Sequence, residues 1–170
     1  MAERQTGSAL FYGDAVSATG STQLYPLGTK REEEGRTFRY VKYNDGAGDI
    51  SAVSGRLVGQ YDSAATYGEP TSWEVTIDIS DSHPDLVTGV LQSAIATGEF
   101  GWVLTAGIAS LTSNSDGDIA RGDPLVWEAS DDTGVVDKAA DGTTERIVGV
   151  AATDDDSSNP ELVYTLVTLE

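Results

Sequence analysis

Hydrophobic and polar residues alternate cleanly in residues 37–43, TFRYVKY. Phe38 and Tyr40 fall on one face of an extended chain, and Val41 and Tyr43 fall on the other. A period of two with aromatic residues is typical of a β-strand. Turn-forming residues flank the segment on both sides, so we expect a single strand here.

A second alternating segment spans residues 73–79, WEVTIDI, and puts Trp73, Val75, Ile77 and Ile79 on one face. After residue 100 the chain consists of short apolar segments separated by clusters of Gly, Asp, Asn and Ser. Short strands at this spacing predict an all-β fold, either a small β-barrel or a β-sandwich. Further strands are predicted over residues 56–61, 101–105, 108–112, 125–129, 135–138, 146–153 and 162–169.

Residues 81–95 are the one place where the pattern allows a helix. Ser82 or His83 is suited to cap a helix that begins at Pro84. The apolar residues that follow fit helical spacing only in part, and Gly89 interrupts them. We therefore expect at most one short helix in the whole chain.

Residues 1–28 show no clear period and are rich in Gly, Ser, Thr and Ala. Such a composition predicts an extended N-terminal arm or an irregular loop. A turn is expected at Glu34-Gly35, immediately before the first clear strand. The predicted organisation is an arm over residues 1–28 and a single β-rich domain over residues 29–170.

The composition narrows the possible functions. The chain has 170 residues, enough for one domain and an arm, and no stretch approaches the roughly 20 apolar residues of a membrane span. It has no Cys and one His, so we expect no disulfide, metal or cofactor. The N-terminus does not resemble a secretory signal. A net charge of −18 disfavours direct nucleic-acid binding because phosphates repel such a surface.

The acidic residues are mostly Asp, 17 against 11 Glu, and the chain has only three Lys. This balance resembles proteins of salt-loving organisms, although an ordinary acidic soluble protein fits equally well. If the first interpretation holds, the melting temperature should be higher in molar KCl than in dilute buffer, because salt screens repulsion among 28 acidic side chains. A melting temperature that salt leaves unchanged or lowers would contradict it.

The sequence contains no convincing catalytic motif. His83 is the single histidine and no G-x-S-x-G motif accompanies it, so we interpret it as a surface or capping residue. Asp132-Thr133-Gly134 spells the aspartic-protease tripeptide, but the chain has no second copy to share a proton. A turn with positive φ at Gly134 explains the tripeptide better. We therefore expect that the protein is not an enzyme.

Three features are weak candidates for ligand binding. Residues 114–118, NSDGD, resemble the start of a calcium loop, but the twelfth position, which needs a bidentate Glu, is Leu. Residues 154–156, DDD, are more consistent with a solvated loop than with a cation site. A sugar-binding platform of Trp73, Trp102 and Trp127 is also conceivable. Each Trp lies in a strand pattern, which favours core packing or a subunit interface.

Two stretches are similar to virion proteins. Residues 26–43, PLGTKREEEGRTFRYVKY, resemble a segment common in tailed-phage particle proteins: a leucine-glycine turn, an acidic stretch and then G-R-x-F-x-Y-x-K. Residues 89–169 resemble capsid decoration proteins of the small β-barrel type. The matching sequences there are GVLQSAIATGEFGWVLTAGIASL, GDIARGDPLVWEA, RIVGVAATD and LVYTLVTL.

The resemblance implies a capsid decoration, or cement, protein of a tailed virus, located on the capsid exterior and stabilising it. It implies two partners, the major capsid protein and further copies of the chain in a homotrimer at threefold or quasi-threefold positions of the icosahedral shell. It implies no catalytic residues. The alternatives are another virion component, such as a tail-tube, head-completion or fibre-base subunit, and a carbohydrate-binding β-module.

The predicted arm carries the candidate capsid-binding residues Phe11, Tyr12, Leu24 and Tyr25. A thread rich in Gly and Ser cannot bury enough apolar surface to order itself. Its aromatic side chains contribute on the order of a few kcal/mol each once a partner surface covers them. We therefore expect a chain without residues 2–25 to fold as a trimer and to lose its binding to empty capsids.

Overall fold

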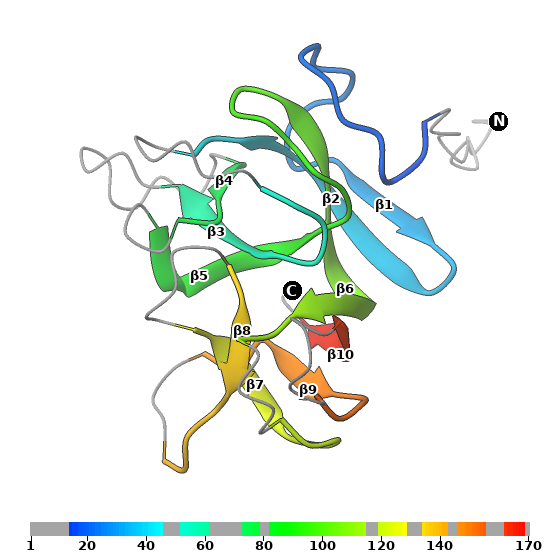
Figure 1. The fold of residues 1–170 in the computed structure, drawn as a ribbon. Coiled ribbons are helices and arrows are strands. Elements are labelled where there is room, and N and C mark those ends of the chain that lie inside the picture. Colours follow the sequence, from blue (N-terminus) through cyan, green and yellow to red (C-terminus); the bar gives the residue numbers. More distant parts are fainter. Residues whose placement is uncertain are drawn as a thin grey trace, which may run out of the picture.

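The structure, a computed structural model, describes residues 14–45, 52–61, 73–78, 82–114, 119–128, 134–142, 146–155 and 162–168. Within these ranges the chain forms ten strands and no helix, so none of the described residues belongs to a helix that could cross a membrane. The strands (Figure 1) are β1 Lys30–Glu33, β2 Arg36–Tyr43, β3 Leu57–Tyr61, β4 Glu74–Thr76, β5 Ser82–Leu91, β6 Phe100–Thr112, β7 Pro124–Trp127, β8 Val136–Lys138, β9 Gly149–Ala151 and β10 Leu162–Thr168.

Five of these strands close into a first barrel. β2 pairs with β4, β4 with β3, β3 with β5 and β5 with β6, and β6 pairs back with β2. All of these pairings are antiparallel except the parallel pair of β2 and β4. Closure satisfies backbone hydrogen bonds that an open sheet would leave unpaired at its edges.

The second half of β6 belongs to a second barrel. Residues 106–112 pair with β10, β10 with β9, β9 with β7 and β7 with β8. A bridge between Ser113 and Val136 connects β8 to the end of β6 and completes the ring. In Figure 1, β7, β8, β9 and β10 lie together below the first barrel, with β6 reaching both groups. The fold is therefore a pair of small barrels that share one long strand.

Gly107 lies where β6 passes from the first barrel to the second. Its φ of +123° is one that L side chains rarely adopt, and a Cβ atom here would lie 3.2 Å from the Arg36 Cα. Glycine lets the strand continue through this conformation. The two strands predicted over residues 101–105 and 108–112 are for this reason one strand.

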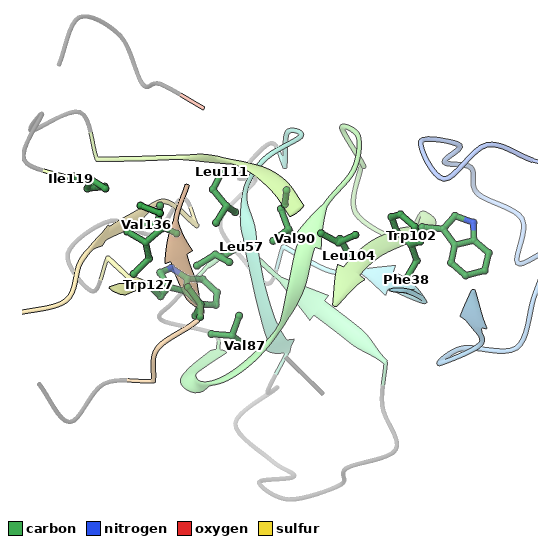
Figure 2. Close-up of a cluster of buried hydrophobic side chains, with 14 of the residues drawn as sticks. Phe38, Leu57, Val87, Val90, Trp102, Leu104, Leu111, Ile119, Trp127 and Val136 are labelled. Atoms are coloured by element: carbon green, nitrogen blue, oxygen red, sulfur yellow. The ribbon is translucent and has the colours of Figure 1, made fainter. Parts of the chain in front are cut away.

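Two hydrophobic clusters stabilise the barrels. One is contributed by all five strands of the first barrel and includes Val41, Tyr43, Val58, Val75, Leu91 and Val103. The other combines residues of both barrels. Figure 2 shows it running from Trp102 and Phe38 of the first barrel to Trp127 and Ile119 of the second. The alternation predicted for β2 is confirmed, since Phe38 belongs to the second cluster and Tyr43 to the first.

The predicted all-β class is confirmed, and the pairings form barrels. The segment over residues 81–95 that allowed a short helix instead contains β5. A reason is visible at Gly89, where any Cβ would come within 2.7 Å of the Leu104 carbonyl oxygen on β6. The predicted turn at Glu34-Gly35 is confirmed, with φ values of 50° and 76°. It joins β2 to β1, a strand that the charged sequence KREE did not predict.

Tyr43 should make the fold sensitive to alkali. Its burial in the first barrel, helped by the nearby Asp45 charge, raises the pKa of the phenol from 10.0 to about 12. The neutral phenol therefore stabilises the fold below pH 10, and roughly 3 kcal/mol of this contribution is lost as the pH rises to 12. We expect Tyr43→Phe to lose less stability than the unmodified chain between pH 9 and pH 12, measured by urea unfolding. Equal losses in both proteins would contradict this.

Candidate functional site

Residues 14–28 lie against the first barrel and are held there by Asp14. The Asp14 carboxylate accepts hydrogen bonds from the Tyr25 hydroxyl and, at 3.3 Å, from the Trp102 Nε1. Its backbone carbonyl accepts a hydrogen bond from Arg31 Nη1 at 2.8 Å. The Arg31 guanidinium also lies over the Trp102 ring, 5.7 Å from its centroid. One acidic residue thus ties the segment to both β1 and β6.

The charge state of Asp14 depends on the same contacts. Burial alone would raise the pKa of this carboxyl, but hydrogen bonds from Tyr25 and Trp102 and the Arg31 charge lower it below the ordinary 3.8. The bond to Asp14 in turn raises the pKa of the Tyr25 phenol. A depressed carboxyl pKa means that the ionised Asp14 stabilises the fold above pH 3.8, and that this contribution is lost as the pH falls below that value.

An aromatic cluster reinforces the anchor. The Tyr25 ring lies edge-on to Tyr40 at 5.2 Å and contacts Trp102 at 5.4 Å between centroids. Tyr40 stacks on Phe100 at 6.2 Å. Gly20 exchanges two backbone hydrogen bonds with Phe100, at 3.1 and 2.9 Å. These contacts make the segment part of the packed body of the protein.

The four candidate residues of the arm have different surroundings. Tyr25 packs against its own barrel, whereas Leu24 is 61% exposed. Leu24 borders a hollow of about 290 Å³, which is also lined by Phe100 and by residues 18–22. Phe11 and Tyr12 lie outside the described residues. Leu24 and the hollow therefore form an open apolar site at the base of the arm.

Trp73 and Arg39 hold the C-terminal end of residues 14–28, at Gly28. Gly28 has φ +79°, and a Cβ there would lie 2.1 Å from the Trp73 Nε1. Arg39 lies over the Trp73 ring at 5.4 Å and donates a hydrogen bond to the Gly28 carbonyl at 3.1 Å. Trp102 and Trp127 are buried. The prediction that the Trp side chains pack in the core and do not form a sugar-binding platform is therefore confirmed for Trp102 and Trp127. The Trp73 ring is covered by Arg39.

The other candidate motifs do not form a reactive site in the described ranges, where no three His, Cys, Asp or Glu side chains are placed to hold a metal. The Asp154 Oδ1 accepts a hydrogen bond from the Arg121 backbone at 2.7 Å. Gly134 has the positive φ expected of a turn, +72°. Most of the calcium-like loop, the Asp132-Thr133 dipeptide and Asp156 lie outside the described residues.

Comparison with known protein families shows to which family the chain belongs. A family model described as phage cement protein matches residues 40–166, which is most of the chain and includes most of both barrels. The chain belongs to the phage cement protein family. No curated protein matches the sequence.

Phage cement proteins are structural proteins, and this cement protein is a decoration protein that stabilises the capsid from its exterior. The matched range begins at Tyr40, within β2. The anchored segment, β1 and the preceding residues therefore lie outside the range that the family model matches.

Sequence reasoning missed the residues that anchor the segment. Asp14 stands between Gly13 and Ala15 in the sequence, and its partners Arg31 and Trp102 are 17 and 88 positions away. No local period or motif connects the three. The one available signal was the isolated acidic residue in a segment otherwise poor in charge.

Proposed function

We propose that this cement protein binds the outer capsid surface as a homotrimer and that each copy grips the major capsid protein with its N-terminal arm. The observation that supports the grip is the anchoring of Asp14 on the first barrel, because Asp14 directly follows residues 1–13 in the sequence. Phe11 and Tyr12 come directly before that anchor in sequence. Residues 14–28 then serve as the base of the arm and residues 1–13 as its gripping part.

The free energy of burying apolar side chains favours this division into a base and a gripping part. A short arm gains apolar contacts only when a partner surface covers it, and each buried aromatic contributes roughly 1.5–3 kcal/mol. An extended segment can also add its backbone hydrogen bonds to a sheet edge of the partner. In a homotrimer the first bound arm raises the local concentration of the other two near the capsid. Three contacts of modest affinity therefore give a high overall affinity.

Leu24 is proposed as a second capsid contact. Its side chain is largely exposed and stands beside the hollow lined by Tyr40 and Phe100. An apolar side chain of the capsid protein would fill part of this hollow and cover Leu24 at the same time. Exposed apolar residues next to a hollow are typical of protein-contact sites.

The acidic body would face solvent in this arrangement. A chain of net charge −18 repels other copies of itself across water, which keeps decorated particles apart. The proposal gives the protein a structural role and no catalytic one.

The test is binding of the purified protein to empty capsids of its virus. Co-sedimentation should show saturable binding, and decorated capsids should rupture at a higher temperature than bare ones. Leu24→Ser should lower the affinity, whereas Val53→Ser, at an apolar position of 42% exposure in the loop before β3, should not. Absence of binding, or equal rupture temperatures at full occupancy, would contradict the proposed function.

A further inference from the structure

The second barrel carries a row of apolar positions across four neighbouring strands. Ile108 of β6 is the register partner of Leu166 of β10, Leu166 pairs with Val150 of β9, and Val150 pairs with Pro124 of β7. Ile108 is 59% exposed and Val150 is 43% exposed. Strands lie about 4.8 Å apart, so the row extends over about 14 Å. We call these four residues the apolar row.

The strands that carry this row lack charge. β6, β10, β9 and β7 contain 13, 7, 3 and 4 residues, and none is Asp, Glu, Lys or Arg. The whole chain is 22% charged. By contrast, β1 is charged throughout and β2 carries Arg36, Arg39 and Lys42. A solvent-facing sheet normally carries polar or charged residues on its outer face, so these four strands differ from the charged β1–β2 hairpin.

We propose that the apolar row is the face through which copies of this chain associate with one another. The argument is electrostatic. Copies with a net charge of −18 repel wherever charged surfaces approach, and like charges brought together across an interface oppose binding. Contact is therefore favoured where the surface is both apolar and uncharged, and the apolar row satisfies both conditions. Ile108, Val150 and Pro124 are exposed apolar residues on three strands of this sheet, and exposed apolar groups of this kind are typical of such contacts.

This inference deepens the proposed homotrimer and rests on it. In a closed ring of three copies, residues close to the symmetry axis meet their own equivalents or near neighbours. Three copies of the apolar row around one axis would cover Ile108 and Val150, and Arg36 of the β1–β2 hairpin, which lies against Gly107, would be at the edge of the contact. Leu24 and the Asp14 anchor belong to the surface of the first barrel and remain free to contact the capsid.

The test introduces one acidic residue at a time at exposed apolar positions. Ile108→Glu and Val150→Glu place a charge in the apolar row, and Val53→Glu places the same charge at an exposed position in the loop before β3. Sedimentation velocity over a range of concentrations, in molar KCl, measures self-association. Circular dichroism confirms that each variant is folded. Binding to empty capsids is measured separately.

The unmodified chain and Val53→Glu should sediment as the same oligomer. Ile108→Glu and Val150→Glu should associate roughly 30-fold or more weakly. A folded Ile108→Glu variant that associates like the unmodified chain overturns the inference, as does an unmodified chain that stays monomeric while binding capsids. If Ile108→Glu keeps its oligomeric state and loses capsid binding, the apolar row contacts the capsid and the inference is wrong. An oligomer that does not bind capsids would instead refute the proposed function.

Discussion

A chain from which residues 2–13 have been deleted should fold normally and bind empty capsids roughly 100-fold or more weakly. The deletion ends before Asp14, so the hydrogen bonds from Tyr25, Trp102 and Arg31 are retained. What is lost is the segment with Phe11 and Tyr12, whose burial against the capsid would contribute several kcal/mol per trimer. Co-sedimentation with capsids measures the affinity, and thermal melting checks the fold.

A longer deletion, of residues 2–25, serves as the comparison. It also removes Tyr25 and Asp14 from the Trp102 side chain, which exposes apolar surface and should destabilise the body by about 2–3 kcal/mol. This is a change from the expectation drawn from sequence, in which residues 2–25 were dispensable for folding. If the shorter deletion still occupies capsids fully, the grip lies on the barrels and the arm proposal fails.

Replacing Gly134 by Ala should be among the most damaging single substitutions in the chain. Gly134 has φ +72°, and a Cβ there would lie 2.4 Å from the Leu57 carbonyl oxygen. Its own carbonyl accepts a hydrogen bond from the Leu57 nitrogen at 2.7 Å, which joins β3 of the first barrel to the chain entering β8 of the second. The added methyl forces this contact apart, so we expect a loss of about 3 kcal/mol or more.

Gly35 provides a matched control because it has nearly the same backbone conformation, φ +76°, and no atom lies within 4 Å of the position that an added Cβ would take. Gly35→Ala should therefore lose only the backbone term of about 1–2 kcal/mol. The difference of about 2 kcal/mol should separate the two melting temperatures by roughly 4–8 °C. Equal melting temperatures would show that the contact between the barrels can relax at little cost.

Much of the strand content followed from local pattern. The alternation in residues 37–43 placed Phe38 and Tyr43 on opposite faces, and each belongs to a different hydrophobic cluster. Short apolar segments between turn residues likewise marked β7, β8, β9 and β10. The errors fell where a local signal conflicted with tertiary packing. β1 is charged throughout and β5 begins with a helix-like cap, yet both are held as strands by their partners.

By itself, the sequence determined the all-β class, the acidic surface and the resemblance to decoration proteins, because these depend on composition, on a period of two and on turn residues. Only the tertiary structure decided that β6 serves two barrels, that Asp14 binds Trp102, and that Ile108 and Val150 share one row through Leu166. Each of these joins residues far apart in the chain. Register and side-chain pairing across such distances depend on how the strands close, which no local pattern records.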